Sequence, residues 1–105
     1  MISKSALIAL ALIVTTPAYA SDWRYCLSTS TDEHKVYMSE PFQTDAPMDT
    51  VAESFSELMA RLNLQHGEVQ CPRSDSAKSI AIMRNNAIAY TRLNGNDVAP
   101  VNGVP

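Results

Sequence analysis

The chain has 105 residues, a formal net charge of −3 and 46% hydrophobic residues. It contains 2 cysteines and 3 glycines, and it shows no internal repeat, low-complexity tract or cluster of basic residues. This composition argues against disorder, and it makes nucleic acid and anionic membrane surfaces poor partners.

The first 20 residues contain the three parts of a secretory signal in order. Lys4 supplies a positive start, residues 6–14 form an apolar run, and residues 18–20 read Ala-Tyr-Ala, an A-x-A cleavage site. The run is shorter than the roughly 20 residues that a membrane-spanning helix needs. We therefore expect an exported domain of residues 21–105, periplasmic or extracellular, with 7 basic and 11 acidic residues and a net charge of −4 once Lys4 is removed.

The two cysteines of the exported domain, Cys26 and Cys71, are predicted to form one disulfide. In an oxidising compartment this is the default for a single pair, and so small a domain gains much from a covalent link. A reactive thiol and a metal pair are the alternatives. The metal alternative is weak, because no C-x-x-C spacing occurs and the 2 histidines are scattered.

The exported domain begins with a predicted hairpin. Residues 23–30 and 35–39 alternate apolar and polar side chains, which predicts two strands joined by the polar turn 31–34. The connector 40–48 follows, and we expect its large apolar residue, Phe42, to pack onto the core.

Residues 50–62 carry the clearest helical pattern. Thr50 and Glu53 match a capping box, which predicts that the helix begins there, and Gly67 is the expected stop. One apolar stripe follows the helical period: Val51, Phe55, Leu58, Met59 and Leu62. The short segment 68–71 is predicted to be a third strand that places Cys71 beside Cys26.

The next segment fits two structures. As a helix it begins near Ser74 or Asp75 and continues to about Leu93, with Gly95 as its stop. As a hairpin, residues 79–92 would turn at the Asn-Asn pair. Its alanines favour the helix, with a seam of Ile80, Met83, Ala87 and Tyr90. Ile82 and Leu93 then lie off the seam, so that the helix is either covered on two sides or has an apolar outer face.

The tail, residues 97–104, contains Pro100, which confines it to an edge strand or an extended tail. The order ββαβαβ predicts an α+β two-layer sandwich: a mainly antiparallel sheet of about four strands, two helices on one face and one disulfide. This layout loosely resembles the small periplasmic peptidoglycan-binding modules of cell-division proteins. Those modules have a helix after the first strand, and no motif is shared.

Few residues carry a recognisable chemistry. His34 and His66 lie in predicted loops, where both active and merely solvated residues are common. Cys26 and His66 would make a nucleophile and base only if the thiol were free. The acidic positions 32–33 and 45–49 lack the spacing of a calcium loop. We therefore predict no catalytic site, no metal and no cofactor.

The remaining candidates concern binding. Arg73, near a helix start, is placed to meet a carboxylate of a ligand or partner, and Arg84 must pair or extend towards water. Exposed aromatic residues, and Trp above all, favour interfaces. The candidate binding surface consists of Trp23, Tyr25, Tyr37, Arg73, Ile82 and Leu93.

Three functions remain. The first is a non-catalytic binding protein that acts on another envelope protein as an inhibitor, immunity-type or adaptor module. The second is a module for cell-wall glycan or a small ligand, and the last is a small hydrolase using His34 or His66. Aromatic side chains on an open sheet face or in a groove would favour the second, whereas an apolar patch around Ile82 and Leu93 would favour the first.

Overall fold

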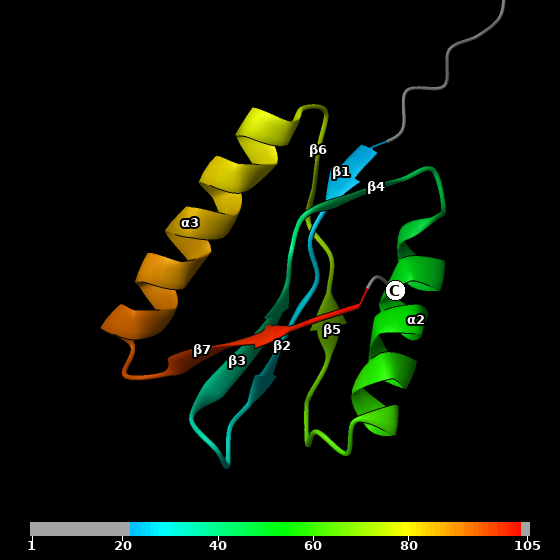
Figure 1. Cartoon of the computed structure of the whole chain (residues 1–105). Coiled ribbons are helices and arrows are strands. Elements are labelled where there is room, and N and C mark those ends of the chain that lie inside the picture. Colours follow the sequence, from blue (N-terminus) through cyan, green and yellow to red (C-terminus); the bar gives the residue numbers. More distant parts are fainter. Residues whose placement is uncertain (1–21, 104–105) are drawn as a thin grey trace, which may run out of the picture.

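The computed structural model describes residues 22–103, so the predicted signal peptide lies outside the described residues. Figure 1 shows the elements in chain order. They are β1 (Asp22–Arg24), β2 (Leu27–Ser30), β3 (Lys35–Ser39), β4 (Phe42–Thr44), α2 (Met48–Arg61), β5 (Val69–Gln70), β6 (Arg73–Ser74), α3 (Ala77–Leu93) and β7 (Asp97–Val101).

The strands pair in the orders β4-β1-β6 and β5-β2-β3-β7. β1 and β2 follow one another along one extended segment, as do β3 and β4, and β5 and β6. Among the pairings of residues 22–103, only β3–β7 is parallel. Opposite Cys26 the ladder contains a bulge: the Ser39 N–H donates to the Cys26 carbonyl, and the Cys26 N–H donates to Ser39 Oγ at 2.9 Å instead of to a backbone carbonyl.

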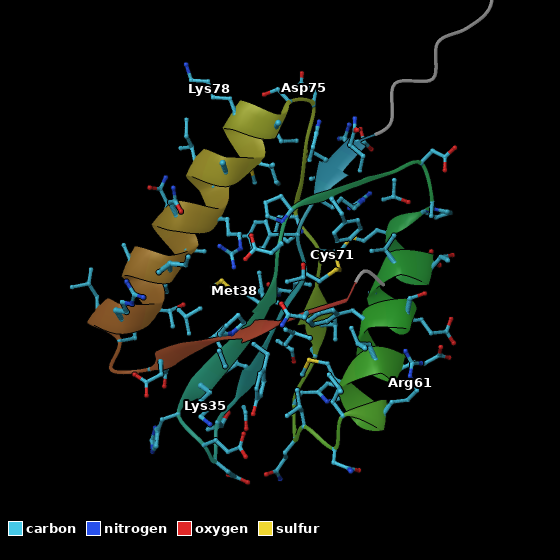
Figure 2. All side chains as sticks on the ribbon, in the orientation of Figure 1. Lys35, Met38, Arg61, Cys71, Asp75 and Lys78 are labelled. Atoms are coloured by element: carbon cyan, nitrogen blue, oxygen red, sulfur yellow. A yellow bond between two sulfur atoms is a disulfide. The ribbon has the colours of Figure 1, made fainter. Side chains whose placement is uncertain are left out.

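The predicted α+β class, element order and single disulfide are confirmed, but the expected placement of both helices on one face is wrong. Side chains of α2 pack with Tyr37, whereas Ile80 of α3 packs with Val36 and Met38. Since neighbouring residues of a strand point to opposite faces, α2 and α3 cover opposite faces of the sheet (Figure 1). Figure 2 shows Met38 on the α3 side of the strands and Cys71 on the α2 side.

The core therefore has two parts, and the strands are buried on both sides. The cluster on the α2 side consists of Cys26, Tyr37, Phe42, Val51, Phe55, Met59, Cys71 and Val101. The smaller cluster on the α3 side consists of Tyr25, Val36, Met38 and Ile80, with partly buried apolar neighbours that include Trp23 and Ile88. The predicted packing of Phe42 onto the core is confirmed.

The helix α2 begins earlier than predicted, and the capping box does not form. Pro47 occupies the N-cap without a side-chain hydrogen bond, and its carbonyl accepts from the Val51 N–H, so that Thr50 already lies inside the helix. The helix ends at Arg61 with Leu62 as its C-cap, close to the predicted end at residue 62, and Gly67 is not its stop. Asn63 adopts a φ of 58°, and the Leu64 N–H donates to the Met59 carbonyl, which is a Schellman ending.

The helical alternative for the segment after Cys71 is confirmed as α3. Ser76 caps it by accepting a hydrogen bond from the Ser79 N–H at 3.0 Å, and Gly95 ends it with a φ of 82°. The predicted seam is half right. Ile80 is buried and Ala87 is half-buried, but Met83 and Tyr90 are exposed.

The two remaining strand predictions are also confirmed. The third strand extends through β5 and β6 along the first strand segment, and the tail forms β7, which lies at one end of its sheet beside β3. Pro100 therefore sits in an edge strand, where its missing N–H breaks no ladder between two neighbours.

Candidate functional site

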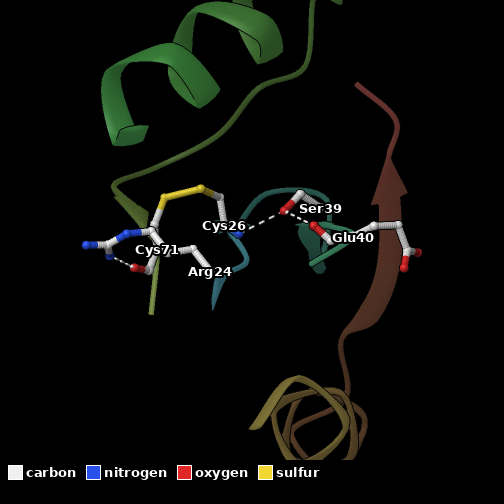
Figure 3. The surroundings of a disulfide bond; sticks show 5 residues. All are labelled: Arg24, Cys26, Ser39, Glu40 and Cys71. Carbon is white, nitrogen blue, oxygen red and sulfur yellow. Dashed lines mark hydrogen bonds between the residues drawn. A yellow bond between two sulfur atoms is a disulfide. The ribbon is translucent and has the colours of Figure 1, made fainter. Parts of the chain in front are cut away.

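The disulfide joins the middle of two neighbouring strand segments. The pairs Arg24↔Arg73 and Leu27↔Gln70 set the register, so that Cys26 lies directly opposite Cys71, and the two form the predicted bond (Figure 3). Both residues are fully buried. Because neither cysteine is free, a Cys26–His66 nucleophile pair cannot form.

His66 has a different partner. Its Nδ1 lies 3.0 Å from the Leu64 carbonyl, and its Nε2 lies 3.1 Å from Ser56 Oγ. A carbonyl only accepts, so Nδ1 donates to it, and in the neutral ring Nε2 then accepts from the Ser56 hydroxyl. A hydroxyl paired with an oriented imidazole is the pattern of an activated nucleophile. The same contacts also tie the loop after α2 to that helix. Ser56 was not predicted, because nothing in the sequence pattern distinguishes it.

The other histidine occupies the hairpin turn. His34 is exposed, has a φ of 55°, and its N–H donates to the Thr31 carbonyl. It contacts the rest of the sheet through its own carbonyl, which accepts from the Asp97 N–H at 2.9 Å. Its role in the fold is therefore to shape the turn.

The aromatic residues of the strands do not share one surface. Tyr25 is buried on the α3 side, where burial raises the pKa of its hydroxyl, and Trp23 is half-buried beside it. Tyr37 is buried on the α2 side. Its hydroxyl donates to Glu33 Oε1 at 2.6 Å, which raises the pKa of Tyr37 and lowers the pKa of Glu33.

Both candidate arginines have partners within the chain. The Arg73 guanidinium donates to both oxygens of Asp22 at 3.0 and 3.2 Å, and this hydrogen bonding lowers the pKa of Asp22. Arg84 donates from Nε to the Ser39 carbonyl at 2.8 Å and lies 3.5 Å from Glu40. Arg84 therefore anchors α3 to the end of β3, where the bulge lies.

The structure brings four large apolar side chains together on the outer face of α3. This outer α3 surface consists of Ile82, Met83, Tyr90 and Leu93, with exposed fractions of 51%, 36%, 69% and 85%. Helical spacing places Ile82 and Leu93 on the side away from the buried Ile80 and Thr91. Met83 and Tyr90 lie on the adjoining flank, and Tyr90 also lines the groove between α3 and the sheet. The sequence prediction found Ile82 and Leu93 but assigned Met83 and Tyr90 to the core.

The α3 groove lies between that helix and the sheet. It has a volume of about 360 Å³, and Leu27, Val36 and Met38 line it together with Tyr25, which contributes an aromatic ring. Gln70, Asn94 and Asn96 add amide groups, and none of the lining residues is charged. An apolar pocket with a few hydrogen-bonding groups suits a small uncharged ligand.

Within residues 22–103, no group of three or more His, Cys, Asp and Glu side chains is placed to hold a metal ion. None of the helices in that range is long and apolar enough to cross a membrane. Comparison with known proteins gave no matching family model, curated protein or solved structure.

Proposed function

We propose that this chain is an exported, non-catalytic binding protein that acts on another protein of the cell envelope, as an inhibitor, immunity-type or adaptor module, and docks through the outer α3 surface. The observation that carries the proposal is the exposure of four large apolar side chains on one side of a single helix. Export is supported by the signal-like N-terminus and by the disulfide, which persists in oxidising compartments.

The outer α3 surface is not needed to hold the helix in place. Ile80 and Thr91 are buried on the inner side, Arg84 anchors the middle, and Ser76 and Gly95 shape the two ends. The four side chains form two pairs about two turns apart, with the exposed Asn86 between them. Large apolar side chains gathered on one side of an element often mark a contact with another molecule. Tyrosine, represented here by the exposed Tyr90, is among the residues that contribute most to binding at interfaces.

The charges on α3 restrict the kind of partner. Lys78 lies one turn before Ile82, Arg92 lies beside Leu93, and residues 77–93 contain no Asp or Glu. Figure 2 shows Lys78 projecting away from the sheet at the start of the helix. A second copy docked through the same helix would bring like charges together. The complementary partner therefore has an apolar contact flanked by acidic residues.

The test compares capture by the exported domain and by two variants. Ile82→Gln/Leu93→Gln removes apolar contact. Leu62→Gln is the control, at the C-cap of α2, where Leu62 is 49% exposed. All these positions are exposed, so we expect stability changes within about 0.5 kcal/mol. Proteins captured from an envelope extract are identified and purified, and their affinities are measured by calorimetry. We expect at least tenfold weaker binding for the double variant and unchanged binding for the control.

Three results would overturn this proposal. One is an identified partner that binds the double variant as well as the parent protein. Another is a dimer of the parent protein that the double variant converts to a monomer, since a second copy would then cover α3. The third is binding to anionic lipid vesicles that the double variant loses while no protein partner is captured.

The α3 groove supports a second candidate, a module for cell-wall glycan or another small uncharged ligand. The supporting observation is its lining of aromatic, apolar and amide groups without a charge. The probe is chitotriose, titrated into the labelled domain by NMR. This candidate predicts saturable shifts of the Gln70 side-chain amide and a loss of affinity in Gln70→Ala but not in Gln65→Ala. Equal binding by both variants, or no binding, would exclude it.

A further inference from the structure

A second groove, the edge groove, lies beside β5 and β6, near the start of α2. Its volume is about 540 Å³, and Met48, Val69 and Pro72 contribute apolar walls. Arg24 and Arg73 also line it. β5 and β6 are the last strands of their sheets, so one edge of this segment has no neighbouring strand among residues 22–103.

Arg24 is the unusual residue of this groove. It is 6% exposed, and its Nη1 donates to the Cys71 carbonyl at 2.7 Å (Figure 3). Its Nε is buried and has no hydrogen-bond partner among residues 22–103. Two ion pairs form in that range, Arg73–Asp22 and Arg84–Glu40, and Arg24 takes part in neither. A buried cation without a counter-charge is destabilising unless an anion compensates for it.

Arg24 and Arg73 are the two cations that line the groove, and of these Arg24 is the one without an ion pair among residues 22–103. Arg73 already donates to both oxygens of Asp22. The charge of Arg24 adds to the effect of Arg73 in lowering the pKa of Asp22. Glu68 also lines the groove and is exposed, so water screens it. A ligand carboxylate that reaches the guanidinium from the groove therefore meets a cation that no carboxylate of residues 22–103 contacts directly.

The strand edge indicates what carries that carboxylate. The Tyr25 N–H donates to the Pro72 carbonyl, so the Cys71 carbonyl faces the open edge, where Arg24 reaches it. Arg24 thus occupies the point at which an added strand would have to pair. Because Arg24 already satisfies the Cys71 carbonyl, a peptide that extends along the edge loses a ladder partner at this point, which favours a peptide that ends beside Arg24.

We infer that the edge groove binds the C-terminal residue of an extended peptide, whose α-carboxylate accepts hydrogen bonds from Arg24 and whose apolar side chain packs on Met48, Val69 and Pro72. Guanidinium groups bind carboxylates strongly because two N–H groups can donate in parallel. Capture of a terminal carboxylate beside a sheet edge combines two known modes of peptide recognition. The site is separate from the outer α3 surface and does not depend on it.

The experiment uses two tripeptides that differ only at the C-terminus, acetyl-Ala-Ala-Leu with a free carboxylate and the same peptide as an amide. The labelled exported domain is titrated with each peptide while NMR follows the Nε–H resonance of Arg24. We expect a saturable shift with the acid and at least tenfold weaker binding of the amide. Octanoate, a carboxylate without peptide groups, should bind more weakly than the acid peptide.

Variants at the groove rim test the site without touching Arg24, whose replacement risks the fold. Met48 is 47% exposed at the first position of α2, where an acidic residue suits the helix dipole. We expect Met48→Glu to weaken binding of the acid peptide at least fivefold relative to Met48→Gln. Ile82→Gln/Leu93→Gln should bind it normally, which separates this site from the proposed function.

The inference would be overturned by equal affinity for the acid and the amide, or by an Arg24 resonance that moves with neither. It would also be overturned by equal affinities of Met48→Glu and Met48→Gln. Tighter binding of octanoate than of the peptide would show that the groove selects an acyl chain rather than a peptide terminus.

Discussion

Removal of the Cys26–Cys71 disulfide should cost this domain most of its stability. The two residues are separated by 45 positions, and for a loop of this size the chain-entropy relation gives about 4 kcal/mol. Domains of this size often have little more than that in total. We therefore expect Cys26→Ala/Cys71→Ala to lower the melting temperature by roughly 15–30 °C.

The assay is urea unfolding of the oxidised parent protein and the double variant, followed by circular dichroism. Without the crosslink the unfolded chain is less compact. The variant should therefore expose more surface on unfolding and show a larger m-value. If the variant is unfolded in buffer, an osmolyte titration recovers the transition. A loss below about 1 kcal/mol would refute the chain-entropy estimate for this loop. Since both cysteines are fully buried, reduction of the native protein by dithiothreitol should proceed only as fast as the domain opens.

Three smaller changes test the local structure. Gly95→Ala should destabilise the domain by about 1 kcal/mol, because Gly95 has a φ of 82°. In the same urea assay Gly95→Asn should lose less stability, since Asn tolerates a positive φ better than Ala. Equal losses of stability in the two variants would contradict the backbone explanation. Ser76→Ala should cost about 1 kcal/mol through the lost cap, whereas Ser79→Ala should be nearly neutral, because Ser79 contributes only its backbone N–H to the cap. Hydrogen bonding to Arg73 lowers the pKa of Asp22 in the folded state. The charged carboxylate therefore stabilises the folded state at pH values above the pKa of the unfolded chain. This contribution disappears as the pH falls through the pKa of the folded state. Asp22→Asn should therefore flatten the fall in stability below about pH 4, and superimposable stability–pH curves would exclude this contribution.

Sequence periodicity located the elements but not the faces they cover. Residues 36–38 are all buried, and successive apolar residues are typical of a strand covered on both sides. A one-sided alternation through Tyr37 predicts a two-layer arrangement, whereas burial of all three residues requires cover on both faces. The second error was the start of α2, where the capping box of Thr50 and Glu53 was a plausible local signal. The helix instead begins directly after Pro47. No local pattern in the sequence indicates which of the two starting points the helix adopts.

The sequence predicted the parts of the candidate site that depend on composition or on the residue pattern within one element. The disulfide followed from composition and compartment, and the apolar outer face of α3 followed from Ile82 and Leu93. The contacts of Arg24 and Ser56 depend on segments that the fold brings together from distant parts of the chain. The Arg24–Cys71 hydrogen bond spans 47 residues, and a single sequence contains no pattern that pairs such positions.

The arrangement of the helices explains why α3 retains apolar residues on its outer side. With both helices on one face of the sheet, Ile82 and Leu93 would have been available to pack against α2. In this structure α2 covers the other face, and Leu93 remains 85% exposed. Side chains this exposed add nothing to the core and reduce solubility. No element of residues 22–103 covers them, so we expect the cover to come from another molecule, and the basic residues Lys78 and Arg92 make an acidic surface its best match.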